Sequence, residues 1–346
     1  MTGILMHKNI FLHIGPHKTG TTSLQSWAQA NEQVICKYGI FYPKSGRNTD
    51  GNHSSVAWSL SENGRAENGV FRSFLNEIEN SSEPNILVSG EEFEYLGSDD
   101  IRKLKEELKE YSVKIILTLR PQHEIIRSQY GEWIKQFLTI DDFSYFWRVH
   151  HKFPEYNFTA MIMKWSEFFG LGNMIIISFD EARRSKNGII SEFCHILKIP
   201  ENETVIHDRK NLSDSAEILL LWKYMLSKVQ LVSGARIGLE DQSLGDQKFE
   251  VITKLREQYG SIIDETKRMY IENEFIQTPF RGYSNTELHV VQEGFSELNQ
   301  ELFKISGRKL WDQKLQDEDC LTYHAVSPLA IQKADDLFLA LLRKPA

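Results

Sequence analysis

The sequence contains little cysteine and no long apolar run. Its 346 residues include three cysteines, Cys36, Cys194 and Cys320, and none of them forms a Cys-x-x-Cys pair. A scattered, odd-numbered set argues against a disulfide framework or a cysteine-based zinc site, and it favours reduced thiols in a cytoplasmic setting. No stretch approaches the roughly 18 apolar residues that a membrane-spanning helix needs. We therefore expect a cytoplasmic protein without a transmembrane segment.

Positive charge is also scarce. The chain has 40 Lys and Arg residues against 48 Asp and Glu residues, for a net charge of -8 at pH 7. A nucleic-acid-binding protein should carry a basic surface, so this class is excluded, and any anionic ligand must find a local cationic pocket. The first residues, MTGILMHKNIFLHI, lack the apolar core of a signal peptide because His7, Lys8 and Asn9 interrupt them.

The most informative stretch runs from Asn9 to Gln25, NIFLHIGPHKTGTTSLQ. An apolar run over 10–14 predicts a buried strand, and Gly15 to Gly20 then form a loop that tolerates tight backbone geometry. The hydroxyl residues 21–23 can cap a helix whose apolar face begins at Leu24. A strand, a glycine-containing loop and a helix N-terminus direct N–H groups at an anion, so this stretch predicts a phosphate or sulfate site.

The spacing within this loop differs from that of a nucleoside-triphosphate loop. The sequence G-x-x-x-x-G-K-[ST] would need a lysine after the second glycine, but Thr21 stands there. The lysine of this loop is Lys18, which precedes Gly20. The pattern Gly-x-x-Lys-Thr-Gly-Thr-Thr resembles the phosphosulfate-binding loop of sulfotransferases that use PAPS (3'-phosphoadenylyl sulfate), in the bacterial, carbohydrate-type branch.

The rest of the chain predicts an α/β fold. Besides the run over 10–14, apolar runs predict strands at Gly39–Pro43, Asn85–Ser89, Val113–Leu119 and Asn173–Phe179. Helical patterns separate them, which implies a parallel sheet with right-handed crossovers. We predict helices over 21–38, 54–60, 66–79, 99–111, 121–137, 141–151, 157–169 and 187–197. After residue 213 the pattern becomes helical, with segments over 213–229, 248–270, 286–305 and 328–342.

The resemblance specifies this fold further. It implies a P-loop-containing, three-layer fold with a central parallel sheet. We predict a PAPS-binding core over 1–212 and a helical region over 213–346, which serves as a lid or a subdomain.

The resemblance also assigns roles to residues at strand ends. It implies that Lys18, Thr19, Gly20, Thr21 and Thr22 hold the 5'-phosphosulfate of the donor.

Arg120 follows the strand VKIILTL, and Ser128 lies on the next helix. Together they resemble the pair that holds the donor's 3'-phosphate. A guanidinium matches phosphate oxygens bidentately and a hydroxyl adds one more donor.

The general base is open between a carboxylate and a histidine. The group Ser89-Gly90-Glu91-Glu92-Phe93 resembles a motif of bacterial members in which a glutamate activates the acceptor. This implies that Glu91 is catalytic and contacts the acceptor, with Glu92 and Glu94 as solvated acids. His17, inside the loop, is a second catalytic candidate, and His53 resembles an acceptor-binding histidine.

The expected reaction moves a sulfuryl group from PAPS to an acceptor hydroxyl or, as a weaker alternative, an amine, giving 3',5'-ADP. It needs no metal, because cations already hold the phosphate leaving group. Family analogy suggests a small-molecule, carbohydrate or glycolipid acceptor. The lack of a membrane anchor favours a soluble bacterial enzyme over the anchored Golgi members. Two alternatives stay open: a P-loop kinase or nucleotide hydrolase, and a non-catalytic binding module.

Overall fold

The computed structural model describes residues 8–61, 69–206, 214–238, 245–312 and 326–342. Its internal contacts divide the chain into two compact units, each discontinuous in sequence. The first unit comprises residues 1–125, 153–210 and 295–313, and the second comprises 126–152, 211–294 and 314–346. The continuous division into 1–212 and 213–346 stays a prediction.

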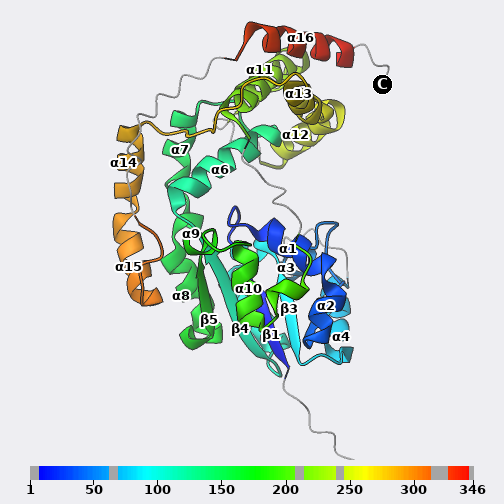
Figure 1. Ribbon diagram of the computed structural model, residues 1–346, viewed down its shortest axis with the longest axis vertical. Coiled ribbons are helices and arrows are strands. Elements are labelled where there is room, and N and C mark those ends of the chain that lie inside the picture. The colour runs from blue at the N-terminus through cyan, green and yellow to red at the C-terminus, as the bar shows by residue number, and fades with distance from the viewer. Residues whose placement is uncertain (1–7, 62–68, 207–213, 239–244, 313–325, 343–346) are drawn as a thin grey trace, which may run out of the picture. The chain divides into compact units, whose positions relative to one another are not determined.

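A parallel sheet of five strands forms the centre of the first unit, which confirms the predicted α/β class. Its strands are β1 (Asn9–His13), β2 (Ile40–Phe41), β3 (Asn85–Ser89), β4 (Ser112–Leu119) and β5 (Met174–Ser178). They lie in the order β2-β3-β1-β4-β5 (Figure 1). Because all strands run in the same direction, the segments that follow them meet at one edge of the sheet.

Helices cover both faces of this sheet. On one face, α1 (Thr21–Ala30), α2 (Glu32–Lys37) and α10 (Ile189–Leu197) pack on alternate side chains of the strands, such as Leu87 and Ile116. On the other face, α8 (Phe158–Phe169) contacts β4 and β5. Helices α5 (Ser98–Glu107) and α15 (Ser296–Ser306) pack against α8 in turn. The remaining helices of this unit are α3 (Ser54–Leu60), α4 (Val70–Asn80) and α9 (Phe179–Ala182).

Three helices that the sequence pattern predicts as continuous are interrupted. The helix over 21–38 ends at Ala30, because the Asn31 side chain donates to the carbonyls of Trp27, at 2.9 Å, and Val205, at 2.8 Å. The helix over 248–270 is split at Gly260, a poor helix former, into α12 (Gly245–Tyr259) and α13 (Ser261–Glu272). The helix over 286–305 is split at Phe295 into α14 (Asn285–Gly294) and α15.

The described residues of the second unit form helices and loops, apart from one isolated bridge between Ser215 and Pro279. It contains most of α6 (Gln122–Lys135), together with α7 (Phe143–His150), α11 (Ala216–Ser233), α12, α13, α14 and α16 (Pro328–Leu342). The rings of Tyr130, Phe143 and Phe146 pack together in its core. Tyr130 contacts the other two edge to face at 5.1–5.2 Å, and Phe143 and Phe146 are stacked at 6.5 Å. None of the helices in the described ranges has the length and apolar character to cross a membrane.

Candidate functional site

A buried polar layer supports the carboxyl edge of the sheet. His13 at the end of β1 contacts the Ser89 hydroxyl on β3 (2.9 Å) and the Thr118 hydroxyl on β4 (3.4 Å). The Gln25 amide of α1 donates to the same Ser89 hydroxyl at 3.3 Å. Burial lowers the pKa of His13 to about 3, so its ring is neutral at physiological pH. These hydrogen bonds hold the ends of three strands and the first helix in one fixed arrangement.

The loop between β1 and α1 has an unusual backbone. Gly15 and Gly20 have φ of 91° and 88°, and Lys18 has φ of 64°. A lysine in the left-handed region is uncommon, costs about 1–2 kcal/mol and is typical of functional sites. The Thr19 hydroxyl is buried and donates to the Pro16 carbonyl at 2.6 Å. The predicted loop residue Thr19 therefore braces the turn that carries Lys18.

Gly20 is the N-cap residue of α1, and Thr21 and Thr22 form its first turn. The first N–H groups of a helix have no partner within the helix, so this end can bind an anion. A Cβ atom at Gly20 would lie 3.0 Å from Cε2 of Phe179, the residue that follows β5. The loop and the start of α9 therefore approach each other closely, and only glycine fits at this position.

A cluster of ionisable side chains lies beside the loop, on the 3₁₀ turn η1 (Glu91–Tyr95) that follows β3. The Thr21 hydroxyl donates to Oε1 of Glu91 at 2.5 Å. On the other side of that carboxylate, Nε2 of His17 lies 3.5 Å from Oε2 of Glu91. Nδ1 of His17 is hydrogen-bonded to Oε1 of Glu94. The structure thus brings together Glu91, Thr21 and His17, three of the predicted site residues.

The expectation that Glu94 is a solvated acid is wrong. Its side chain is 3% exposed and bonded to His17, because η1 turns residue 94 inward. Burial alone would lower the pKa of His17, but the bond to Glu94 and the charges of Glu91 and Glu94 raise it to about 9. His17 is therefore an imidazolium at neutral pH.

Glu92, the other expected solvated acid, is also partly buried. Burial raises its pKa, and its side chain is hydrogen-bonded to Asn52. Tyr95 is exposed, and its ring centroid lies 5.5 Å from that of His17. Glu155, on the 3₁₀ turn η2 (Pro154–Tyr156), adds a further nearby carboxyl whose pKa burial raises. Four carboxyl groups therefore interact with the charge of His17, and two of them, Glu91 and Glu94, contact its ring.

Arg120, which follows β4, lies on another side of the loop. Its Nη1 donates to the Lys18 carbonyl at 3.2 Å, and its Nε donates to Glu124 at 2.8 Å. The guanidinium carbon is 5.0 Å from the ring centroid of Phe179. Arg183 contacts the same Glu124 carboxylate at 3.5 Å from a half-exposed position. Arg120 therefore contacts the main chain of the loop that carries Lys18, and the phosphate-binding roles of both residues stay predictions.

Sequence reasoning missed Glu124, Phe179 and Arg183. The available signal was position, since Glu124 lies one helical turn beyond Arg120 and Phe179 directly follows β5. Residues after a parallel strand face the same edge as the loop, so they were candidates by topology alone.

Two further predicted residues are Ser128 and His53. Ser128 lies on α6 in the second unit, and its role as a phosphate ligand stays a prediction. His53 is completely buried; its Nε2 is 2.9 Å from the Pro43 carbonyl, and its Nδ1 is 3.3 Å from the Ser89 N–H. A neutral ring satisfies both contacts, which join the residue before α3 to Ser89 of β3 and to Pro43, just after β2. The acceptor-binding role of His53 stays a prediction.

The structure is similar to a solved sulfotransferase from Alicyclobacillus acidocaldarius, with 15% sequence identity and a TM-score of 0.38. The match covers 65% of this chain and 96% of that chain. No protein-family model matches the sequence, and no curated protein does either. At this similarity the comparison assigns no activity, so function rests on the residues themselves.

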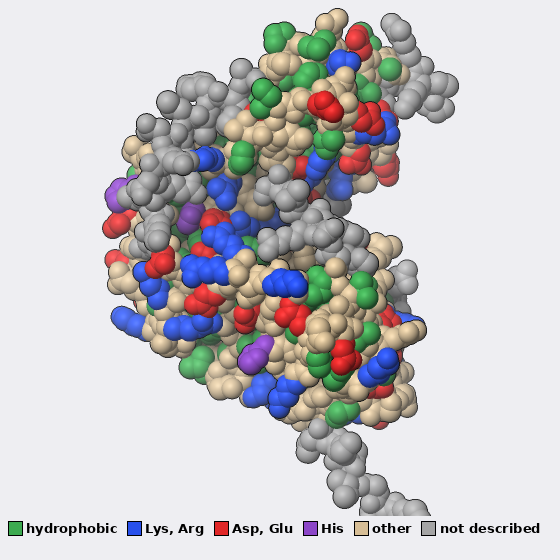
Figure 2. All heavy atoms as spheres, viewed as in Figure 1, with side chains coloured by type: hydrophobic (Ala, Val, Ile, Leu, Met, Phe, Trp, Pro, Cys, Tyr) green, Lys and Arg blue, Asp and Glu red, His purple; other side chains and the backbone are tan. Residues whose placement is uncertain are grey.

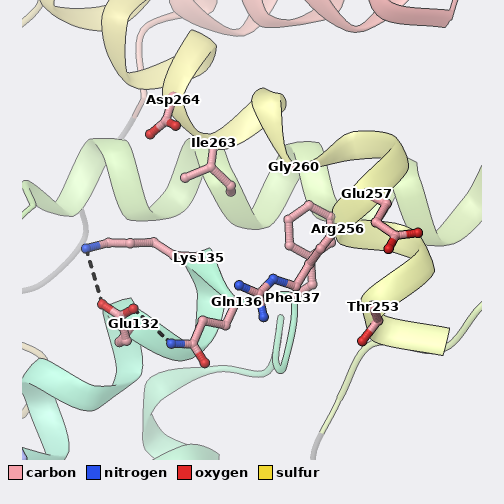
Figure 3. Close-up of a pocket in the computed structure, with 10 residues that line it drawn as sticks. All are labelled: Glu132, Lys135, Gln136, Phe137, Thr253, Arg256, Glu257, Gly260, Ile263 and Asp264. Carbon is pink, nitrogen blue, oxygen red and sulfur yellow. Dashed lines mark hydrogen bonds and ion pairs between the residues drawn. The ribbon is translucent and has the colours of Figure 1, made fainter. Parts of the chain in front are cut away.

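The second unit contains a separate hollow of about 550 Å³ (Figure 3). It is lined by Glu132, Lys135, Gln136, Phe137, Thr253, Arg256, Glu257, Gly260, Ile263 and Asp264. Lys135 forms ion pairs with Glu132 at 3.6 Å and with Asp214 at 2.8 Å. No residue that the sequence predicts as functional lines this hollow.

Charged side chains of both signs are interspersed over the face shown in Figure 2. In the part of the chain that the structure describes, no group of three His, Cys, Asp or Glu side chains is arranged to hold a metal ion.

Proposed function

We propose that this chain transfers a sulfuryl group from PAPS to an acceptor hydroxyl and releases 3',5'-ADP. The observation that supports this most directly is the β1–α1 loop. Lys18 has a left-handed backbone there, Arg120 donates to its carbonyl, and Glu91 faces the first turn of α1. The site thus combines cations for an anionic donor with a carboxylate for an acceptor proton.

The residues of the first unit fit the donor. The N-terminus of α1 offers main-chain N–H groups to the 5'-phosphosulfate, and the left-handed residues 15, 18 and 20 curve the loop around it. Arg120 uses Nε and Nη1 for protein contacts, and among the described residues no group accepts from Nη2. That edge of the guanidinium is suited to oxygens of the 3'-phosphate. Ser128 is the predicted second ligand.

The donor supplies a sulfur atom that is open to attack by the acceptor oxygen. Lys18 places a positive charge beside the bond that breaks and stabilises the negative charge left on the phosphate oxygen. Glu91 takes the proton of the acceptor hydroxyl. The Thr21 hydroxyl, 2.5 Å from Oε1, fixes the orientation of this carboxylate, whose Oε2 lies 3.5 Å from Nε2 of His17. By family analogy the acceptor is a carbohydrate or another small alcohol.

Thermal unfolding with ligands tests this proposal. The purified protein would be heated with 3',5'-ADP, with 5'-AMP, and with ATP plus Mg²⁺. A ligand at about 100 times its dissociation constant adds about 2.7 kcal/mol to the unfolding free energy. We expect stabilisation by 3',5'-ADP without metal and little from 5'-AMP. Stabilisation by ATP with Mg²⁺ alone would favour the kinase alternative and contradict the proposal.

A further inference from the structure

The ring of His17 is held between two carboxylates. Nδ1 is hydrogen-bonded to Oε1 of Glu94, and Nε2 lies 3.5 Å from Oε2 of Glu91. A neutral imidazole has one N–H and one lone pair, so one of its nitrogens would direct a lone pair at an anionic oxygen. The doubly protonated ring presents an N–H group to each carboxylate. The geometry therefore favours the charged form of His17.

Glu94 is the buried member of this pair of acids. Its side chain is 3% exposed, against 12% for Glu91 and 31% for His17. A buried carboxylate without a cationic partner is strongly destabilising. Burial of Glu94 therefore favours the ion pair between its carboxylate and the His17 imidazolium. The Glu91 carboxylate also accepts a hydrogen bond from the Thr21 hydroxyl and lies next to the first turn of α1. The two acids thus have different tasks, one structural and one facing the loop.

The other charged groups around the ring do not replace Glu94. Glu92 and Glu155 act on His17 through charge, and both have a raised pKa because of burial. Lys164 of α8 also lies near Glu94, but its Nζ donates to the main-chain carbonyls of Leu96, at 2.7 Å, and Glu94, at 3.4 Å. The Tyr95 ring contacts His17 without an ion pair. Glu94 is the carboxylate that is hydrogen-bonded to the ring.

We propose that Glu94 is a positioning residue that keeps His17 positively charged, and that His17 therefore serves as a fixed cation beside the donor loop and not as the general base. This inference rests on the proposed function for its catalytic part. During transfer, a bond forms between the acceptor oxygen and sulfur, and the bond between sulfur and the phosphate oxygen breaks. That electron pair stays on 3',5'-ADP, and the acceptor proton goes to Glu91. The His17 charge balances Glu91 and Glu94 near an anionic donor.

The charge of His17 can be measured without any substrate. We would follow the ring signals of the histidines by NMR against pH and assign His17 from the spectrum of His17→Gln. In the wild-type protein, His17 should titrate near 9, well above its ordinary value of 6.5. In Glu94→Gln it should titrate at or below 6.5, because burial remains while the bonded carboxylate is gone. Glu155→Gln, which removes a nearby acid without a bond to the ring, is the matched control and should retain most of the elevation.

The pH dependence of turnover separates the two roles of His17. If it acts as a cation, wild-type turnover should persist until about pH 9, and Glu94→Gln should lose turnover as pH rises through its lowered pKa. At pH 7.5 this predicts a loss of roughly tenfold, because only about a tenth of the rings stay protonated at a pKa of 6.5. If His17 were the base, Glu94→Gln would instead be more active than wild type at neutral pH.

His17→Lys gives a further check, because lysine keeps the charge. We expect it to retain more turnover than His17→Gln at pH 7.5. The inference is overturned if wild-type His17 titrates near 6.5, if Glu94→Gln leaves its titration unchanged, or if Glu94→Gln gains activity at neutral pH. The first outcome needs no variant, so it applies even if Glu94→Gln fails to fold. A high His17 pKa with no sulfuryl transfer to any acceptor would refute the proposed function and the cation's catalytic role, and leave the charge assignment standing.

Discussion

Replacing Arg120 with lysine should weaken both the fold and the proposed donor site, although the charge is conserved. The guanidinium makes two directed hydrogen bonds, to Glu124 and to the Lys18 carbonyl, and lies over the Phe179 ring. A lysine ammonium cannot reproduce this fork. A hydrogen bond to a charged group contributes about 1.5–3 kcal/mol, and an exposed cation–π contact about 0.5–1 kcal/mol. Because lysine can recover part of the charge interaction, we expect a net loss of about 1–2 kcal/mol.

The second effect concerns ligand affinity. Losing a bidentate contact to the 3'-phosphate should weaken 3',5'-ADP binding by roughly tenfold to a hundredfold, which corresponds to about 1.4–2.8 kcal/mol. The assay is urea unfolding with and without 3',5'-ADP, followed by titration calorimetry.

Arg183→Lys is the matched control, because Arg183 contacts the same Glu124 from a position that is 47% exposed. It should change stability by no more than about 0.5 kcal/mol. If Arg120→Lys proves as stable as wild type and binds 3',5'-ADP equally well, the assigned role of the guanidinium is refuted.

Three further changes test other parts of the site. Lys18→Ala should lower the release of 3',5'-ADP by orders of magnitude while the far-UV circular dichroism stays native; near-normal turnover would exclude the lysine from the reaction. Gly20→Ala should lose more than about 1–2 kcal/mol of stability, because residue 20 has a φ of 88° and an added Cβ would lie 3.0 Å from Phe179. The assay is urea unfolding. The control is Gly172→Ala, where no atom lies within 4 Å of the added Cβ. Acidification should also destabilise the protein. Burial lowers the pKa of His53 to about 4 and that of His13 to about 3. Because the unfolded chain takes up protons first, stability falls as pH drops from about 6.5 toward 4 and 3. His53→Gln should flatten that limb in pH-dependent melting, and an unchanged slope would show that the ring is not buried in its neutral form.

Much of the fold could be predicted from local patterns. Continuous apolar runs such as VKIILTL mark buried parallel strands directly, and the segment 54–60 is a helix with the predicted bounds. The helix breaks at Asn31 and Phe295 could not be predicted, because local sequence patterns do not record contacts with distant parts of the chain. The Asn31 side chain, for example, bonds to Val205, 174 residues away.

The site was predictable only where residues lie in a known order. The loop lysine and the arginine after β4 could be placed by spacing, but the burial and bonding of an acidic side chain could not. Whether Glu94 is solvated depends on the turn that η1 makes after β3 and on a histidine 77 residues earlier in the chain. Sequence patterns record which acids are present, whereas their burial and bonding arise from the register between β1 and β3.

The position of β1 has a consequence for how this protein is made. It is the first strand to be synthesised, yet it is the central strand of the sheet, and its neighbours β3 and β4 begin at Asn85 and Ser112. Both of its edges therefore stay unpaired while about 75–100 further residues leave the ribosome. Parallel pairing across such separations is slow, and an open apolar strand can pair wrongly during that time. The segment that carries the proposed donor loop is thus also a strand that can mispair on both edges during synthesis.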